Sequence, residues 1–252
     1  MTSPQIVQAA PGLTDDQLIE LYQSPGPAPW VRANFVQSVD GAIALGDNSS
    51  GLTTPLDQRI LKLLRLLSDV VLVGASTIRA EDYIGIRFSD TDSARRQAWG
   101  MSAVPPIAVV SGRADLDPES RLLTDTLVPP IILTTTSAPS AAKKNLDAAG
   151  ATVVEIGDTS IESAAIIDTL ADFGLRRVIC EGGPTLAGQL AADHVLDELC
   201  LTTVPTILGG PAGRVTHGRM ASLPVRCQHI IVDQDGAQLA RWIVDTHTSA
   251  PQ

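Results

Sequence analysis

The stretch VICEGGPTLAGQL, residues 178–190, decides the fold because it turns an apolar strand directly into a helix. An apolar run ends in the carboxylate of Glu181, two glycines follow, and Pro184 opens a helical pattern. Glycine lets backbone approach a ligand closely, and proline suits a first helical turn because it has no N–H to leave unpaired. These residues therefore fit a ligand-binding site at this turn as well as they fit a simple connection between a strand and a helix.

The start of this helix predicts an anion site that needs no lysine or arginine. The N–H groups of Thr185, Leu186 and Ala187 are expected to point out of the helix end, where the dipole adds partial positive charge. A donor site of this kind matters in a chain whose net charge is −10. An ordinary tight turn would use the same residues, and neither GxGxxG nor GxxxxGK[ST] occurs in the chain.

Composition narrows the classes of function. The chain has 252 residues, of which 44% are apolar and 18% charged, as expected for one large α/β domain. An acidic chain without a basic stripe argues against a nucleic-acid partner, and no apolar run is long enough to span a membrane. The three cysteines are far apart and show no metal-ligand spacing, which favours a cytoplasmic protein without a metal site.

Apolar runs alternate with helical patterns from residue 31 to 192, which predicts a mostly parallel sheet with helices on both faces. The C-terminal part has three strand patterns without a helix between them, and Asp235-Gly236 marks an antiparallel hairpin. We expect one domain over residues 30–246. Residues 1–29 read as a tail, loose up to residue 12, with a short helix opened by a capping box at Thr14 and a Pro-rich loop. Residues 247–252 read as a second tail.

Ligands on open α/β sheets collect at the carboxyl ends of parallel strands. Besides the corner at Glu181, three such ends are unusual: 38–41, 74–77 and 111–113. Asp40 and Glu81 are candidate acids here, although carboxylates at strand ends are also common turn residues. Arg113 is placed to neutralise an additional phosphate.

Five motifs in this order resemble one family, the reductase domain of bacterial riboflavin biosynthesis, a pyrimidine reductase with a dihydrofolate-reductase-like fold. The motifs are SVDG at 38–41, SGLTT at 50–54, LRLLSDVVLVGAST at 64–77, EGGPTL at 181–186 and DELCLTTVPTILGG at 197–210. Many relatives fuse this domain to a zinc deaminase, whose HxE and PCxxC motifs are missing here, so the resemblance implies a stand-alone form.

The resemblance implies hydride transfer from NADPH to the ribosyl C1 of 5-amino-6-(5-phosphoribosylamino)uracil, in a homodimer. An exposed sheet edge containing HIIVD, residues 229–233, would need the cover that a second subunit gives. The implied cofactor residues are Gln37, Leu52, Thr77, Glu81, Ser111, Gly182, Gly183, Pro184, Thr185, Leu186 and Ala187. The implied substrate residues are Asn34, Ser50, Arg65, Arg87 and Glu181, and the candidate catalytic carboxylates are Glu181 and Asp40.

Departures from the family pattern gather on the substrate and nicotinamide side. Asn34 stands where the family has lysine, Leu52 where it has tryptophan, Glu81 where it has aspartate and Tyr83 where it has proline. Two alternatives therefore stay open: a reductase of the same fold that acts on a pterin or folate, and a non-catalytic NADPH-binding paralogue.

Overall fold

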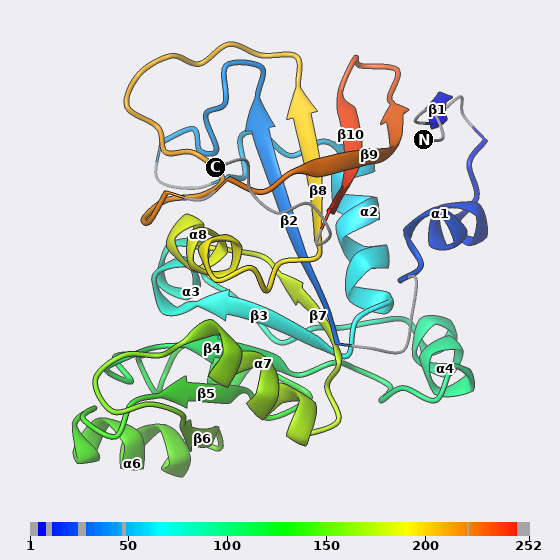
Figure 1. The fold of residues 1–252 in the computed structure, drawn as a ribbon. Helices are drawn as coiled ribbons and strands as arrows, with labels where there is room; N and C mark the ends of the chain where they lie inside the picture. The colour runs from blue at the N-terminus through cyan, green and yellow to red at the C-terminus, as the bar shows by residue number, and fades with distance from the viewer. Residues whose placement is uncertain (1–4, 9–11, 25–28, 47–48, 221, 246–252) are drawn as a thin grey trace. The chain divides into compact units, whose positions relative to one another are not determined.

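The structure is a computed structural model, shown as a ribbon in Figure 1, and it describes residues 5–8, 12–24, 29–46, 49–220 and 222–245. The chain forms two compact units. The first unit contains residues 1–64 and 180–252, and the second contains residues 65–179. The predicted C-terminal tail, 247–252, lies outside the described residues.

The first unit is built on five strands in the order β1-β9-β10-β8-β2. β2 and β8 run side by side in the same direction, whereas β10 is antiparallel to both β8 and β9 (Figure 1). The strands are β1 Gln5–Gln8, β2 Trp30–Ser38, β8 Glu198–Val204, β9 Val225–Val232 and β10 Gln238–Val244. The helices are α1 Asp15–Tyr22, α8 Pro184–Ala192 and α2 Pro55–Leu66, whose last two residues belong to the second unit.

The second unit holds the strands β7-β3-β4-β5-β6, and the β3–β4, β4–β5 and β5–β6 pairs are parallel. The strands are β3 Val70–Gly74, β4 Ile107–Val110, β5 Ile131–Thr134, β6 Thr152–Glu155 and β7 Arg177–Cys180, of which Cys180 belongs to the first unit. The helices are α3 Ala75–Glu81, α4 Asp90–Ala98, α5 Arg121–Thr124, α6 Ser140–Ala148 and α7 Ser163–Asp172. β3, β4 and β5 are almost wholly buried, in keeping with their continuous apolar sequences.

The predicted fold class is confirmed: the chain is an α/β protein with a mixed, mostly parallel sheet and antiparallel strands at its C-terminus. The hairpin at Asp235-Gly236 joins β9 to β10, and Gly236 has a φ of 86°, as a hairpin turn of this kind requires. The capping box at Thr14 is formed, with both of its hydrogen bonds to Gln17.

The N-terminal region departs from the prediction of a loose tail. Residues 5–8 form strand β1, which pairs in parallel with residues 229–232 of β9. The edge that was expected to need a second subunit is therefore covered by the same chain. The sequence argument missed this pairing because a four-residue edge strand carries almost no periodic signal.

Alternation along β2 and β8 gives their shared sheet two distinct faces. In the parallel register Asn34 is paired with Cys200 and Val36 with Thr202. Residues two apart lie on the same face of a strand, so Asn34 and Val36 share one face with Cys200 and Thr202. Gln37 lies on the opposite face. Since Thr202 donates a hydrogen bond to Asp57 of α2, the face of Asn34 is the one that α2 covers.

Candidate functional site

The corner between β7 and α8 is built as a helix start with free donors. Gly182 has a φ of 114°, a left-handed conformation that favours glycine, and Gly183 is the N-cap with Pro184 at the first helical position. The peptide bond between the two glycines is cis. Thr185 and Leu186 follow in the first turn, where amide N–H groups have no partner within the helix.

The donor set at this corner is smaller than predicted. The amide of Ala187 was expected to be free, but it donates to the carbonyl of Gly183 at 3.1 Å and closes the first helical turn. Two amides therefore remain, those of Thr185, which is exposed, and Leu186, which is buried. These two donors and the helix dipole are still the elements of an anion site.

The segment around His217 holds the start of α8 in place. The amide of His217 donates to the carbonyl of Pro184 at 3.0 Å. A Cβ added at Gly188 would lie 2.2 Å from the carbonyl oxygen of His217, so α8 requires glycine at its fifth residue for this close approach. The helix end that offers the donors is thereby fixed by backbone contacts.

Asp40 fastens the loop after β8 to the end of β2. Its carboxylate accepts hydrogen bonds from the Ser38 hydroxyl and from the amides of Leu208 at 3.2 Å and Gly209 at 2.7 Å. These donors, the Ser38 hydroxyl above all, lower the pKa of Asp40 to about 2. At neutral pH the side chain is therefore an anion with three donors. An ionised carboxylate can hold a loop through the hydrogen bonds that it accepts, but it has no proton to give to a substrate.

The predicted cofactor residues Gln37 and Leu52 have defined surroundings in the first unit. The Gln37 amide donates to the Thr203 hydroxyl at 3.4 Å and is half-buried. Leu52 is only 3% exposed and belongs to an apolar cluster with Val36 and Val204, against which Leu208 packs. Ser50, a predicted substrate residue, lies two residues before Leu52, and its carbonyl accepts from the Thr53 hydroxyl at 3.1 Å.

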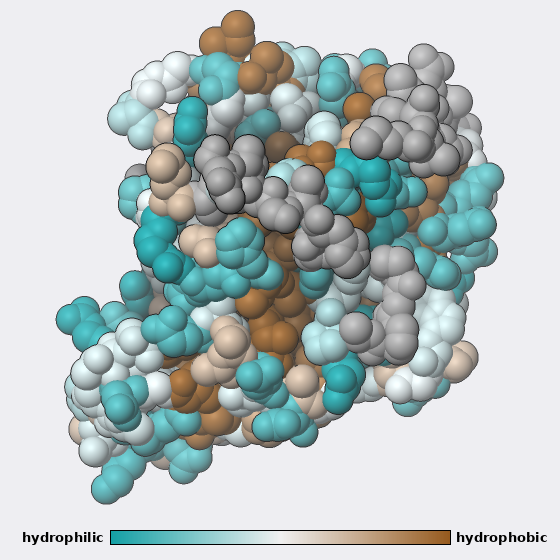
Figure 2. Space-filling model, in the orientation of Figure 1, coloured by the Kyte–Doolittle hydropathy of each residue, from teal (hydrophilic) through white to brown (hydrophobic). Residues whose placement is uncertain are grey.

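Exposed apolar side chains border the carboxyl ends of β2 and β8. Val39 is 60% exposed, Leu45 55% and Ile207 78%. Figure 2 shows apolar groups reaching the surface at the top of the view, where Figure 1 places the loops that follow these two strands. The same end of the first unit therefore combines an apolar rim with the Asp40 contacts.

In the second unit, Ser111 and its neighbours form a polar cluster after β4. The Ser111 hydroxyl donates to Asp115 at 2.9 Å, and Arg79 lies 3.4 Å from the same carboxylate. Burial raises the pKa of Asp115, but the Ser111 hydroxyl and Arg79 outweigh it and the pKa is lowered. Arg113 is 82% exposed and only 3.8 Å from Asp115, so its guanidinium faces solvent beside Ser111.

The other predicted residues of the second unit sit on or next to helices. Thr77 is half-buried in the first turn of α3 and Glu81 is the last residue of that helix. Arg87 forms an ion pair with Asp125, so the side chain predicted to bind a substrate phosphate already has an anionic partner. The backbone carbonyl of Arg65 accepts a hydrogen bond from the buried guanidinium of Arg96 at 3.1 Å.

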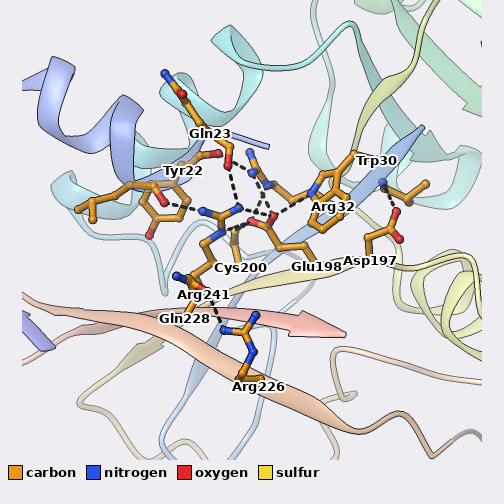
Figure 3. A network of polar contacts seen from close by, with 12 residues as sticks. Tyr22, Gln23, Trp30, Arg32, Asp197, Glu198, Cys200, Arg226, Gln228 and Arg241 are labelled. Atoms are coloured by element: carbon orange, nitrogen blue, oxygen red, sulfur yellow. Dashed lines mark hydrogen bonds and ion pairs between the residues drawn. The ribbon is translucent and has the colours of Figure 1, made fainter. Parts of the chain in front are cut away.

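A buried ion cluster in the first unit escaped the sequence analysis. Figure 3 shows Glu198 between the guanidinium groups of Arg32 and Arg241, with the indole N–H of Trp30 donating to the same carboxylate. Glu198 is 0% exposed. Burial raises its pKa, but the two arginines outweigh burial and hold the pKa below its usual range.

The two arginines of this cluster also anchor helix α1. Arg32 donates to the carbonyl of Tyr22, and Arg241 donates to those of Leu21 and Gln23 (Figure 3). These carbonyls are at the C-terminal end of α1, where the helix leaves acceptors unpaired and the dipole is negative. The cluster therefore joins α1 to β2, β8 and β10.

A second buried carboxylate, Asp57 of α2, was also missed. It is 4% exposed, and the Thr202 hydroxyl donates to its Oδ1 at 2.6 Å. Its sequence context, the third residue of a helix after proline, resembles an ordinary acidic residue that complements the helix dipole. Burial raises its pKa, with the Thr202 hydrogen bond opposing the rise.

No helix among the described residues is both long and apolar enough to cross a membrane. In the same part of the chain, no group of three His, Cys, Asp or Glu side chains is arranged to hold a metal ion.

These features define a class: an α/β protein with two unpaired amide donors at the start of a helix, a loop fixed by a carboxylate, and two buried acids, Glu198 on the sheet and Asp57 on a helix that covers it. The chain belongs to the RibD C-terminal domain family, whose sequence model matches residues 29–239.

Several relatives are named 2,5-diamino-6-ribosylamino-4(3H)-pyrimidinone 5′-phosphate reductase. The one from Archaeoglobus fulgidus is 29% identical over 186 residues, which cover 72% of this chain and 83% of the relative. The one from Aquifex aeolicus is 28% identical over 187 residues, which cover 72% and 79%. The riboflavin biosynthesis protein RibD of Mycobacterium tuberculosis is 28% identical over 228 residues, 89% of this chain but 57% of that protein.

Solved structures share the fold. A pyrimidine reductase-like protein from Corynebacterium diphtheriae superposes with a TM-score of 0.82 at 22% identity, covering 92% of this chain and 99% of that one. Acinetobacter baumannii RibD gives a TM-score of 0.71 at 20% identity, covering 86% of this chain and 58% of that one.

Proposed function

We propose that this chain is an NADPH-dependent reductase of riboflavin biosynthesis that reduces the ribosyl group of a 6-ribosylaminopyrimidine 5′-phosphate. The observation that carries the proposal is the family match over residues 29–239, which includes all four unusual strand ends. Relatives that share about three quarters of the chain are named as reductases of such a compound. A cytoplasmic homodimer is part of the proposal, on the family resemblance alone.

The donor set fits a phosphorylated dinucleotide. The two amides at the start of α8, in the first unit, are suited to the pyrophosphate of a dinucleotide. In the second unit, Arg113 is exposed and remains predicted to neutralise an additional phosphate. When bound, NADPH supplies the hydride. Gln37, Leu52, Thr77 and Glu81 remain predicted cofactor residues, and Gly182 through Ala187 form the predicted phosphate corner.

The reaction requires the substrate sugar to open before it is reduced. The bond between C1 and the ring oxygen of the ribose breaks, and the N–H proton of the exocyclic amine passes to that oxygen, which leaves an imine between the exocyclic nitrogen and C1. The hydride then adds to C1, and a proton goes to the nitrogen. Asp40, with its pKa of about 2, is unsuited to give that proton, so of the two predicted catalytic carboxylates we assign proton handling to Glu181. Arg65, Arg87, Ser50 and Asn34 remain predicted substrate residues, with the arginines suited to the 5′-phosphate.

The direct test is turnover. Purified full-length chain should oxidise NADPH when it is given a 6-ribosylaminopyrimidine 5′-phosphate, and mass spectrometry should show a ribityl product two hydrogens heavier. A separate measurement of NADPH binding distinguishes a chain that does not bind the cofactor from one that binds it without catalysis. NADPH binding without reduction of any pyrimidine or pterin substrate would overturn the proposal in favour of the non-catalytic paralogue.

The cofactor assignment is tested by Thr185→Glu. A carboxylate in the first turn suits the helix dipole, so stability should be kept, but it repels a pyrophosphate at the same place. We expect NADPH affinity, measured by nucleotide fluorescence, to fall at least about tenfold, which corresponds to about 1.4 kcal/mol. Thr185→Gln is the control of similar size without the charge. Equal NADPH affinities of the two variants would mean that the pyrophosphate does not bind at the start of α8.

A reductase acting on a pterin or folate is the second candidate. Asn34, in place of the family lysine, and the buried acid Asp57 favour it, because a buried carboxylate suits the amino-substituted ring of a pterin. Steady-state rates with dihydrofolate and with the ribosylaminopyrimidine phosphate, measured on the same preparation, decide between the two.

A further inference from the structure

A buried guanidinium group caps the C-terminal end of helix α2. It belongs to Arg96 of α4, which is 0% exposed. Its Nη1 donates to the carbonyls of Arg65 at 3.1 Å, Leu66 at 2.7 Å and Ser68 at 2.7 Å. The last carbonyls of a helix have no partner within the helix, and the dipole is negative at that end. Arg96 therefore satisfies the end of α2 from a separate helix.

The charge of Arg96 is not neutralised by an ion pair with any of the described residues. Its Nε donates to the carbonyl of Ser102 at 2.8 Å, and its Cζ lies 5.7 Å from the centroid of the Phe88 ring. Burial lowers its pKa to about 10, with Asp69 acting against burial, so the group is still a cation at neutral pH. Burying a cation is costly unless polar groups surround it. The donors of Arg96 are therefore used to hold main-chain carbonyls in place.

The backbone of Arg65 is set by the turn that ends α2. Its carbonyl accepts from the amide of Ser68 at 3.2 Å as well as from Arg96. Asp69 fixes the far end of this turn, because its amide donates to the carbonyl of Arg177 at 2.7 Å and its carboxylate accepts from the Arg177 guanidinium at 2.7 Å. Without Arg96 the carbonyl side of the turn would lose its side-chain donor in a buried place, and the position of Arg65 would change.

Arg96 also contacts the segment that carries the second predicted phosphate arginine. Phe88, whose ring it meets, directly follows Arg87 in the sequence. The ion pair of Arg87 with Asp125 is made through Nη2, and a guanidinium has further donors that an anion can use. One buried side chain therefore joins the segments of Arg65 and Arg87, and all of these residues belong to the second unit.

We propose that Arg96 is a positioning residue for the 5′-phosphate of the substrate, because it holds the segments of Arg65 and Arg87 in the arrangement that binds this phosphate. The inference rests on the proposed function. Being fully buried, Arg96 acts through the two other arginines, of which Arg65 is half-buried and Arg87 is exposed. Charge-assisted hydrogen bonds to a phosphate depend on geometry, so a small displacement of their donors weakens binding of the phosphate without altering the reaction at C1.

The test compares a 6-ribosylaminopyrimidine 5′-phosphate with the same compound without its phosphate, in steady state with saturating NADPH. The wild type should prefer the phosphorylated compound by at least about 100-fold in kcat/KM. In Arg96→Met the KM for the phosphorylated compound should rise at least about tenfold while kcat changes little, the pattern expected when uniform binding is lost. The kcat/KM of the unphosphorylated compound should stay the same.

Arg241→Met is the matched control. Arg241 is also buried and also donates to carbonyls at the end of a helix, α1, but it belongs to the first unit. Its loss should lower the temperature of thermal unfolding without changing the preference for the phosphate. Arg96→Lys keeps the charge with fewer well-placed donors, so its preference should lie between those of the wild type and Arg96→Met. If Arg96→Met does not fold, Arg96→Lys and Phe88→Leu take its place, each with a preference at least about threefold below the wild type.

The outcomes separate this inference from the proposed function. If the Arg96 variants lose stability but keep the preference for the phosphate, or if Arg241→Met lowers that preference equally, Arg96 is only a helix cap and the inference is overturned while the proposed function stands. A wild type that reduces both compounds equally well has the same meaning. If neither compound is reduced, the proposed function falls, and calorimetry with ribose 5-phosphate decides. The inference then requires binding by the wild type and at least about tenfold weaker binding by Arg96→Met.

Discussion

Glu198 of strand β8 and Asp57 of helix α2, which covers the same face of the sheet, are both buried acids, yet their surroundings are opposite. Glu198 has two arginines and an indole N–H around it, and its pKa is lowered (Figure 3). Asp57 has a single hydroxyl partner, and its pKa is raised. A carboxylate satisfied by its own chain stabilises the fold, whereas one left partly paired is free to bind a ligand. The difference in pairing indicates that Asp57, rather than Glu198, is the buried acid to examine for function.

The largest effect should come from Glu198→Gln. The substitution leaves two buried guanidinium groups without their anion, which should lower the free energy of unfolding by about 3–5 kcal/mol in urea titrations. Replacing Arg32, Glu198 and Arg241 together by methionine should restore most of the loss, because an apolar cluster of similar volume has no charge to compensate. A Glu198→Gln chain as stable as the wild type would make this cluster dispensable and end the comparison.

His229 should make the same cluster sensitive to acid. It is 1% exposed, its Nε2 is unpaired within the described chain, and its ring meets that of Tyr22 at 4.9 Å. Burial, with Arg241 and Arg32 acting in the same direction and Glu198 against them, lowers its pKa to about 4.

Because the unfolded chain binds this proton near pH 6.5 and the folded chain only near pH 4, stability is full above pH 6.5. It should fall as pH drops, by about 2 kcal/mol between pH 7.5 and 5. His229→Phe keeps the ring contact and should remove this slope in urea titrations at several pH values. If the free energy of unfolding of His229→Phe still fell as steeply with pH as that of the wild type, another group would take up the proton. Loss of stability below pH 4 should remain, because that window belongs to carboxylates such as Glu198.

The smallest effect on stability should come from Asp57→Asn. Removing a half-paired buried charge relieves its desolvation, so the free energy of unfolding should stay the same or rise by up to about 1 kcal/mol. Thermal unfolding without ligand measures this. A loss as large as that of Glu198→Gln would show that Asp57 is a structural acid after all, and that the two regions do not differ in kind.

Local sequence signals predicted the main secondary-structure elements and the fold class well. The Gly-Gly-Pro corner gave the start of α8, Asp235-Gly236 gave the hairpin, and the alternation of runs gave the α/β class. Each of these features depends on residues that are adjacent in the sequence, and the conformational preferences of those residues are known from their types. The early strand β1 was missed because it is short and lies at an edge.

Partnerships across the chain were beyond the same reasoning. Asp40 was read as a strand-end acid, and the amides that fix its role come from residues 208 and 209, far away in sequence. Glu198 in DELC reads as a surface charge, because its neighbours Leu199 and Leu201 are the apolar residues there, whereas the structure buries Glu198 and leaves both leucines half-buried. Asp57 gave no signal, since Thr202 approaches it only in the folded chain.

One measurement tests the central claim most directly: oxidation of NADPH by the purified chain in the presence of a 6-ribosylaminopyrimidine 5′-phosphate, with the products analysed by mass spectrometry. The account predicts a ribityl product two hydrogens heavier than the substrate, formed in step with the loss of NADPH. NADPH binding without any such product would contradict the account.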